Sequence, residues 1–259
     1  MDQRTAKNSA AYMLDRLQLM RKNNPHLKLL DVGTGPGTIS VGFAQTIPEG
    51  YVTAVDLSSE AIRKARGVAE EACMKNIEFL VADIRELPFS DETFDITHCH
   101  QVLTHIGEPW NALRELLRVT KAGGIVAVRE GDLETECVWP ESAGILKFHQ
   151  FVARMMKLAG GSVTAGRQLL SWALMAGAKR DQITLSYSTW SYNTASEKNG
   201  WARAMVKEIN RGQWRDAGLR AELATEQDFD EMAEAWEEWA GRAEATLAMI
   251  QGEIIIQKQ

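Results

Sequence analysis

The sequence predicts an α/β fold in which a mostly parallel sheet holds a ligand at the ends of its strands. The apolar run Lys28–Val32 is typical of a buried strand, and it is followed by a glycine-rich turn and then by the apolar periodicity of a helix. A second apolar run, Tyr51–Val55, ends in Asp56 and also leads into a helix. Strands that alternate with helices in this way form βαβ units, and such units build a parallel sheet.

The turn after the first predicted strand contains three glycines at alternate positions, Gly33, Gly35 and Gly37. Glycine adopts positive φ readily and lacks a Cβ, so the backbone can approach a ligand and the start of the next helix can point free N–H groups at an anion. The dinucleotide fingerprint is G-x-G-x-x-G, whereas this turn is G-x-G-x-G and is preceded by Asp31. A carboxylate there repels phosphate but attracts an ammonium group, directly or through water. The pattern therefore favours a nucleotide-like ligand without a pyrophosphate.

Acidic residues close the next two strands as well. Asp56 ends the second strand, where a carboxylate in nucleotide-binding α/β folds accepts hydrogen bonds from ribose hydroxyls. The alternative is that Asp56 caps the following helix, a role that Ser58 can also fill. Asp83 follows the third predicted strand, Ile77–Val81. Because the carboxyl ends of parallel strands meet at one edge, we expect these acids to face one crevice.

The segment D-x-G-x-G-x-G, which starts at Asp31, resembles motif I of the class I S-adenosylmethionine (SAM)-dependent methyltransferases. The segment LPFSDETFD (residues 87–95) resembles the one before strand four in ubiquinone/menaquinone-methyltransferase-like enzymes. RVTKAGG is similar to the RVLKPGG turn of the family, with Ala122 in place of the usual proline. The specific motifs cover residues 28–130. The resemblance implies a Rossmann-like fold: a mostly parallel seven-stranded sheet, helices on both faces and an inserted helical cap.

The resemblance also implies SAM as the cofactor and S-adenosylhomocysteine (SAH) as its product. Family members usually place a carboxylate beside the adenine amino group at the end of the third strand, which is the position of Asp83. The cofactor-binding residues implied in this way are Asp31, Gly33, Thr34, Gly35, Gly37, Asp56, Leu57, Asp83, Ile84, Gln101 and Val102.

The end of the fourth predicted strand, Ile96–His100, and the loop after it contain three of the five histidines. His98 alternates with His100 inside the strand, which favours a structural role for His98. His100 stands at the mouth of the strand, where class I enzymes face the reactive methyl group. His105, in the next loop or helix, could contact the adenosyl group, orient the substrate or act as a general base. His100 and His105 are therefore the candidate catalytic residues, and the absence of any general base stays open.

The fifth predicted strand ends at the same edge with Glu130 and Asp132 nearby. Either carboxylate could bind substrate or accept a proton, and capping or a surface salt bridge is an equally good interpretation. No Asp or Glu lies at metal-ligand spacing beside the histidines, so we expect no metal site.

Beyond Leu133 the chain departs from the minimal fold. An insertion begins at Trp139, its helix is expected over residues 143–158, and a second largely helical region separates the sixth strand (residues 182–192) from the last (residues 253–257). The aromatic residues and methionines of these helices predict a lid over an apolar pocket, although simple packing is the alternative for each tryptophan. The residues predicted to contact substrate are Tyr12, His105, Trp139, Phe148, Trp172 and Trp201.

The composition limits the partners of the protein. The 259 residues, 45% of them hydrophobic, suffice for one large α/β domain with additions. We expect an N-terminal helical segment (1–27), a SAM-binding core (28–132) and the remaining strands with a substrate cap (133–259). A net charge of −6 without a Lys/Arg cluster argues against a nucleic-acid substrate. The three cysteines are odd in number and far apart, which predicts a reducing, cytoplasmic setting. No apolar run approaches the length of a membrane span, so we expect no membrane partner. Monomer and homodimer both stay open.

The expected function is methyl transfer from SAM to a small, largely apolar molecule. The resemblance favours S-methylation of the thiols of a natural product, such as the dithiol form of gliotoxin, as a step of secondary metabolism. O-methylation of a small phenol and C-methylation of a quinone precursor are alternatives. From another class, the chain could be a SAM-binding regulatory protein without turnover. The spacing of the glycine turn disfavours an NAD-dependent oxidoreductase.

Overall fold

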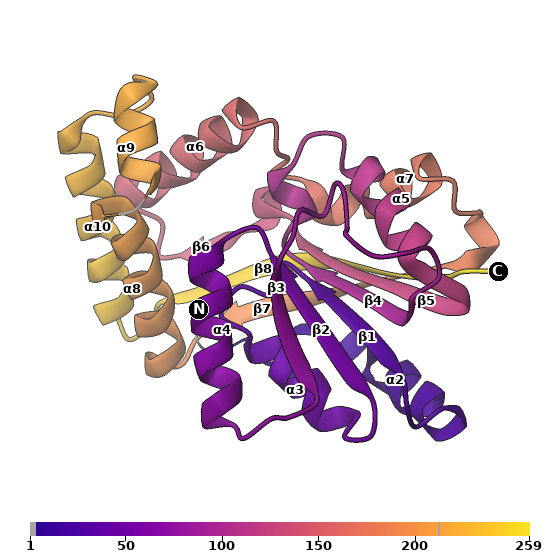
Figure 1. The fold of residues 1–259 in the computed structure, drawn as a ribbon. Helices are drawn as coiled ribbons and strands as arrows, with labels where there is room; N and C mark the ends of the chain where they lie inside the picture. Colours follow the sequence, from indigo (N-terminus) through magenta and orange to yellow (C-terminus); the bar gives the residue numbers. More distant parts are fainter. Residues whose placement is uncertain (1–3, 212) are drawn as a thin grey trace. The chain divides into compact units, whose positions relative to one another are not determined.

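The computed structural model describes residues 4–211 and 213–259, which divide into two compact units (Figure 1). The core unit consists of residues 4–131, Ala165–Tyr187 and Gly252–Gln259, and the cap unit consists of Asp132–Thr164 and Ser188–Gln251. Residues 1–3 of the predicted N-terminal segment lie outside the described residues. The single domain over residues 1–259 stays a prediction.

The core unit is built on five parallel strands: β1 (Lys28–Val32), β2 (Tyr51–Asp56), β3 (Ile77–Val81), β4 (Phe94–His100) and β5 (Thr120–Gly131). β1 pairs with both β2 and β4, while β3 and β5 extend the sheet on either side. The strand order β3-β2-β1-β4-β5-β8 reverses direction between β1 and β4. Such a reversal is a topological switch point, and ligands of open α/β sheets bind outside the carboxyl ends of the strands there.

Side chains that alternate along the strands give the core unit a helical layer on each face of its sheet (Figure 1). Leu29 and Ile96 pack with the helices α2 (Ala11–Asn23) and α3 (Thr38–Thr46). Leu30 and Val128 point to the other face, where α5 (Pro109–Val119) and α7 (Ala165–Met175) cover them. The predicted α/β class with a mostly parallel sheet and helices on both faces is confirmed.

The remaining elements of the core differ in small ways from the expected ones. The N-terminal helix is broken at Ala10, whose φ of −126° and ψ of 18° are not helical, into α1 (Ala6–Ser9) and α2. α4 (Ser59–Glu71) follows β2, and Ser58 caps it by accepting a hydrogen bond from the Ala61 N–H. Short 3-10 turns, η1 (Leu103–His105) and η3 (Arg180–Gln182), follow β4 and precede β7.

Two strands run from one unit into the other along the chain: β7 (Ile183–Tyr192) and β8 (Thr246–Gln257), which pair with each other. The last strand was expected only over residues 253–257, because its first half lacks the Ile run that marks the second half. The described residues form eight strands, one more than the predicted seven. The additional strand is β6 (Cys137–Trp139), which pairs antiparallel with the first part of β8 and is too short to leave a periodic signal.

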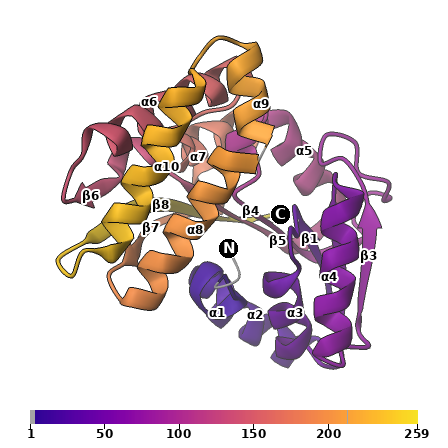
Figure 2. The same cartoon turned by 90° about the vertical axis from the view of Figure 1, so that its left-hand side faces the viewer.

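The cap unit is a group of helices, α6 (Ala143–Leu158), α8 (Ala195–Arg211), α9 (Gln213–Arg220) and α10 (Glu226–Gly241), with the turn η2 (Leu133–Thr135) before them (Figure 2). Their apolar faces share one core, in which Phe148, Phe229 and Trp236 are buried. Gly144 allows α6 to approach α10 closely, since a Cβ on it would lie 2.5 Å from Ala235 Cβ. No helix among the described residues is long and apolar enough to cross a membrane.

Candidate active site

The glycine turn between β1 and α3 is fixed by β2. The N–H groups of Gly33 and Thr34 both donate to the carbonyl oxygen of Val55, at 2.8 and 3.0 Å. Gly33, Gly35 and Gly37 all have positive φ, 76°, 52° and 84°, which explains why glycine stands at each position.

The three glycines differ in what surrounds them. A Cβ on Gly33 would lie 2.1 Å from Val102 Cγ2, and one on Gly37 would lie 2.7 Å from Ala65 Cβ. No heavy atom of the described residues lies within 4 Å of the Cβ position of Gly35. Gly33 and Gly37 therefore allow close packing, whereas Gly35 leaves its backbone open to a ligand.

Asp56 joins the end of β2 to the glycine turn. Its Oδ2 accepts a hydrogen bond from the Gly35 N–H at 2.9 Å, and its Oδ1 accepts one from the Ser58 N–H at 2.9 Å. The helix cap is Ser58, so the capping alternative for Asp56 does not describe this structure. The half-buried carboxylate lies beside the open backbone of Gly35, where a ligand hydroxyl could reach it.

Asp31 is buried under the turn and is bonded to protein groups. His98 Nδ1 lies 2.7 Å from Asp31 Oδ1, and the Ser40 hydroxyl donates to Asp31 Oδ2. Ser40 is also hydrogen-bonded to Thr34, which the sequence placed in the cofactor site. His98 is thus a structural histidine, in agreement with its predicted role. A contact between Asp31 and the cofactor ammonium stays a prediction, and neither Ser40 nor the pairing of Asp31 with His98 was foreseen.

The residues after β2 and β3 include one exposed apolar side chain and one paired acid. Leu57 is 68% exposed and therefore does not belong to the core, whereas Ile84 is buried in the core. Asp83 forms a bidentate pair with Arg85, whose closest contact, Nη2 to Oδ2, is 2.6 Å. Hydrogen bonds from the Arg85 side chain lower the pKa of Asp83, so Asp83 is ionised at neutral pH.

The loop after β4 lies directly against the glycine turn, because the Val102 side chain occupies the space beside Gly33. Gln101 has a positive φ of 54°, and its N–H donates to the Arg129 carbonyl oxygen at 2.9 Å. The structure thus brings one predicted cofactor residue of the loop, Val102, to the glycine turn, and Gln101 precedes it in the chain.

The two candidate catalytic histidines have different surroundings. His100 is buried and its ring stacks on that of His98, with centroids 6.4 Å apart. Burial lowers the pKa of His100 well below its usual range, so its imidazole is neutral and weakly basic. His105 lies on η1 and is exposed, and desolvation together with the nearby positive charge of Arg4 lowers its pKa more modestly. His105 is therefore the better placed of the two to meet a substrate.

Glu130 carries a role that the sequence left undecided. It is fully buried near the end of β5, and its carboxylate accepts hydrogen bonds from the N–H groups of Val102, Leu103 and Thr104. Burial raises the pKa of Glu130 to about 7. Of the interpretations considered, capping is the one observed. The sequence shows an acidic residue near the end of β5, but it does not show which groups that residue bonds to. Asp132 belongs to the cap unit.

Tyr12 and Trp172 are the other core residues predicted to contact substrate. The Tyr12 hydroxyl is buried and has no hydrogen-bond partner among the described residues. Burial, followed by the negative charge of Glu253, raises the pKa of Tyr12 well above its usual range. Glu253 is paired with the buried Arg129 at 3.1 Å. Trp172 is buried in the core beneath α5, which is the packing alternative considered for each tryptophan.

The cap residues predicted to contact substrate, Trp139, Phe148 and Trp201, differ in exposure. Trp139 is 60% exposed, Phe148 is buried, and Trp201 is half-buried with its indole N–H covered. Phe148 and Trp201 both contact Trp236, with ring centroids 5.4 and 6.4 Å from it. The resulting aromatic cluster consists of Phe148, His149, Tyr192, Trp201, Trp236 and Trp239.

One polar pair borders this aromatic cluster. His149 Nε2 lies 2.9 Å from Glu136 Oε1, and the His149 ring is 6.2 Å from that of Trp236. The indole N–H groups of Trp201 and Trp236 are buried and have no acceptor among the described residues. The cap thus encloses aromatic rings together with two indole N–H groups that have no acceptor in the part of the chain that the structure describes.

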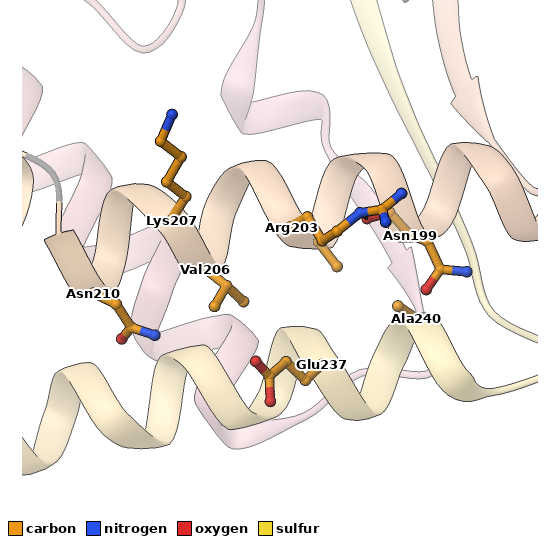
Figure 3. Close-up of a pocket in the computed structure, with 8 residues that line it drawn as sticks. Asn199, Arg203, Val206, Lys207, Asn210, Glu237 and Ala240 are labelled. Carbon is orange, nitrogen blue, oxygen red and sulfur yellow. Dashed lines mark hydrogen bonds between the residues drawn. The ribbon is translucent and has the colours of Figure 1, made fainter. Parts of the chain in front are cut away.

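A groove of about 420 Å³ lies between α8 and α10 on the cap unit (Figure 3). Arg203 and Lys207 bring positive charge and Glu237 brings negative charge to it. The Arg203 Nε–H donates to the Asn199 carbonyl oxygen at 3.1 Å, and Lys207 points away from α10. The charges do not converge on one point, and none of the predicted substrate residues lines this groove.

These features fit SAM better than a dinucleotide. The open backbone at Gly35 and the adjacent Asp56 carboxylate suit a ribose, and the buried Asp31 places negative charge below the turn, which disfavours a pyrophosphate. The described residues contain no group of three His, Cys, Asp or Glu side chains that could hold a metal ion.

Comparison with known proteins decides the family, since a family model described as a methyltransferase domain matches residues 23–173. The chain belongs to this methyltransferase domain family. An uncharacterized methyltransferase of Schizosaccharomyces pombe is 36% identical over 99% of this chain and 91% of its own length. The methyltransferase LtbC of Aspergillus luteorubrus, which is named as probable, is 28% identical over 98% of this chain and 92% of its own.

Other similarities of the methyltransferase are limited to part of the chain or to the fold. The ubiquinone/menaquinone biosynthesis C-methyltransferase of Bdellovibrio bacteriovorus is 36% identical over 40% of this chain and 43% of its own. A Haemonchus contortus phosphoethanolamine N-methyltransferase in complex with SAH has a TM-score of 0.56 at 15% identity, covering 95% of this chain and 53% of that one. The protein is a SAM-dependent methyltransferase, and SAM is its cofactor.

Proposed function

We propose that this methyltransferase S-methylates the thiols of a small, largely apolar natural product, such as the dithiol form of gliotoxin. The observation that carries the proposal is the placement of the two histidines at and after the end of β4: His100 is buried with its ring stacked on His98, and His105 is exposed. Burial lowers the pKa of His100 well below its usual range, and the pKa of His105 is lowered as well. A thiol, with a pKa of about 8.5, ionises more easily than a phenol at about 10, so a weak base suffices for it.

In this proposal the residues of the chain position the reactants rather than activate them strongly. SAM supplies a methyl group that its sulfonium makes electrophilic. Asp56 and the Gly35 backbone would hold the ribose, and Asp31 would favour the ammonium end. Correct alignment of an acceptor in a site that excludes water accounts for a large part of such a rate enhancement.

The aromatic cluster of the cap supports a small, largely apolar acceptor. Trp201 is half-buried and its indole N–H has no acceptor among the described residues, so Trp201 is the member of the cluster that we expect to donate to a carbonyl or similar group of a ligand. We therefore propose that Trp201 and Phe148 contribute to acceptor binding. The three free cysteines support the proposed cytoplasmic location, where thiols stay reduced.

C-methylation of a quinone precursor remains the closest alternative. Its support is the similarity to quinone C-methyltransferases, which covers 40% of the chain and therefore transfers no information about the cap. O-methylation requires a stronger base for a phenol, and His105 is the residue that would have to provide it. Binding of SAM without turnover is the alternative from another class. One structural neighbour at 21% identity, with a TM-score of 0.56, is a [4+2]-cyclase, so the fold by itself does not fix the chemistry.

His105→Ala separates thiol chemistry from base-dependent chemistry. We expect the variant to keep wild-type SAH affinity and to lose less than about tenfold in transfer rate to a thiol, because general acid–base catalysis otherwise contributes about 10²- to 10⁴-fold. The rate is measured with dithiothreitol at several pH values. Loss of most activity at unchanged SAH affinity would instead assign proton transfer to His105.

The acceptor class itself is tested with a panel of small dithiols, phenols and quinols and with methyl-labelled SAM. Mass spectrometry of the products identifies the methylated atom. Transfer to sulfur supports the proposal, and transfer only to oxygen or carbon overturns it. SAH binding without transfer to any member of the panel would favour a regulatory role. Flotation with lipid vesicles provides a further check, since a polyprenyl quinone substrate predicts membrane association.

A further inference from the structure

The buried Glu130 side chain contacts the segment after β4 whose Val102 side chain lies against the glycine turn. Its Oε1 accepts hydrogen bonds from the N–H groups of Val102 and Leu103 at 3.0 and 2.8 Å, and its Oε2 accepts one from Thr104 at 3.3 Å. These are the N–H groups at the start of η1, which have no partner within so short a turn. One carboxylate therefore satisfies three consecutive backbone donors.

The segment held in this way has little other freedom. Gln101 precedes it with a φ of 54°, and its N–H is bonded to the Arg129 carbonyl oxygen. The Val102 side chain fills the space beside Gly33, so a shift of the segment would also disturb the glycine turn. His105 ends the same turn, and its side chain is exposed.

We propose that Glu130 is a positioning residue for methyl transfer: its carboxylate fixes the backbone of Val102–Thr104, and thereby holds the Val102 side chain against Gly33 and sets the positions of Gln101 and His105 on either side of this segment. The proposal rests on the methyltransferase activity of the family and not on the choice of a thiol acceptor. Glu130 accepts hydrogen bonds from the backbone of this loop, and we propose that it acts through the loop.

A buried carboxylate is a costly way to hold a loop, which is why a purely structural role explains it poorly. Burial raises the pKa of Glu130 to about 7, and only the three backbone donors and the positive charge of Arg4 act in the opposite direction. The other titratable group that faces it is the buried Cys99 thiol, whose own pKa is raised by burial and by Glu130. Near neutral pH the carboxylate therefore changes its charge, and the hold on the loop changes with it.

The direction of the pH effect follows from hydrogen bonding. An ionised carboxylate accepts backbone N–H bonds more strongly than a protonated one. We expect the protection of the Leu103 and Thr104 amides against hydrogen exchange, corrected for intrinsic exchange, to rise about tenfold as Glu130 ionises between pH 6 and 8. SAH affinity should rise over the same interval, because Val102 and Gln101 belong to the ordered segment.

The effect on stability has the opposite sign. The pKa of Glu130 is higher in the folded protein than the usual value of about 4.3, so the folded state binds more protons between about pH 4 and 7. Its contribution to stability is therefore present at low pH and is lost as the pH rises through about 7.

Glu130→Gln is the test, with Glu115→Gln as the matched control. Glu115 also accepts a backbone N–H, from Leu87 at 3.0 Å, but it holds a different loop. We expect Glu130→Gln to lose the pH-dependent protection of the Leu103 and Thr104 amides and the pH-dependent SAH affinity. We also expect its stability relative to wild type to be higher at pH 8 than at pH 5. The control should keep the wild-type pH dependence of amide protection and SAH affinity.

The readouts are amide exchange by NMR, SAH calorimetry and denaturant unfolding, none of which needs an acceptor. Failure of the thiol proposal would therefore leave this test intact. Wild-type protection and SAH affinity at every pH in Glu130→Gln would overturn the positioning role. Should that variant fail to fold, Glu130→Asp, which keeps the carboxylate but shortens its reach by one methylene, takes its place, and wild-type protection of the Leu103 and Thr104 amides together with wild-type SAH affinity in it would contradict the proposal.

Discussion

The core unit and the cap unit bury different kinds of polar side chain. In the core, buried carboxylates are bonded to specific protein groups, Asp31 to His98 and Ser40, and Glu130 to the backbone of the loop after β4. In the cap, aromatic rings pack on one another, and the covered N–H groups of Trp201 and Trp236 have no acceptor among the described residues. The core therefore depends on particular residues at particular positions, whereas the cap depends on the total volume and shape of its side chains.

The largest expected effect of a single substitution is in the cap. Trp236→Ala removes a side chain with 0% exposure that contacts Phe148, Trp201 and Trp239, and we expect a loss of about 3–5 kcal/mol in the free energy of unfolding. Denaturant unfolding measures the loss. Leu146→Ala, on the exposed face of α6, is the control and should stay close to wild type. A loss below about 1 kcal/mol for Trp236→Ala would mean that the aromatic cluster is not the centre of the cap.

The smaller effects are in the core, where two neighbouring glycines should behave differently. Gly33→Ala places a Cβ 2.1 Å from Val102 Cγ2 at positive φ, so strain of about 1–2 kcal/mol adds to overpacking of about 1–3 kcal/mol. Gly35→Ala adds only the strain, because its Cβ meets no heavy atom of the described residues within 4 Å.

The comparison of the two variants combines thermal unfolding with SAH calorimetry. Gly33→Ala should be the less stable, while Gly35→Ala should lose SAH affinity out of proportion to its small loss of stability. Equal losses of stability, with SAH affinity unchanged in Gly35→Ala, would mean that the open backbone at Gly35 does not face the cofactor.

The same difference between the units explains what the sequence could predict. The strands and acids of the core follow from apolar periodicity and from Asp31, Gly33 and Asp56 at fixed spacing, because backbone geometry allows few residue types there. The helix over 143–158 was also predicted with the bounds that α6 has. β6 was missed because three residues are too few to show a hydrophobic periodicity. The partners of Glu130 were missed because they are backbone N–H groups, which every residue type except proline has.

Cap side chains were harder to interpret from the sequence. Trp172 and Trp201 look alike in the sequence, but Trp172 is buried in the core unit and Trp201 belongs to the aromatic cluster of the cap. Which tryptophan contacts a substrate depends on tertiary packing, and the composition of the sequence does not reveal that packing. The contacts of Tyr12, His105, Trp139, Phe148, Trp172 and Trp201 with substrate stay predictions.

Calorimetric titration of wild type and Asp56→Ala with SAH tests most directly whether the cofactor binds at the glycine turn. Asp56 holds the Gly35 N–H at 2.9 Å and is the carboxylate expected to meet the ribose. Hydrogen bonds to charged groups contribute about 1.5–3 kcal/mol. We therefore expect wild type to bind SAH, and Asp56→Ala to bind it about 10- to 100-fold more weakly. Asp91→Ala, which removes an exposed carboxylate paired with Arg118, should bind like wild type. Absence of SAH binding by the wild-type protein, or equal affinity in Asp56→Ala, would contradict a cofactor site at the glycine turn.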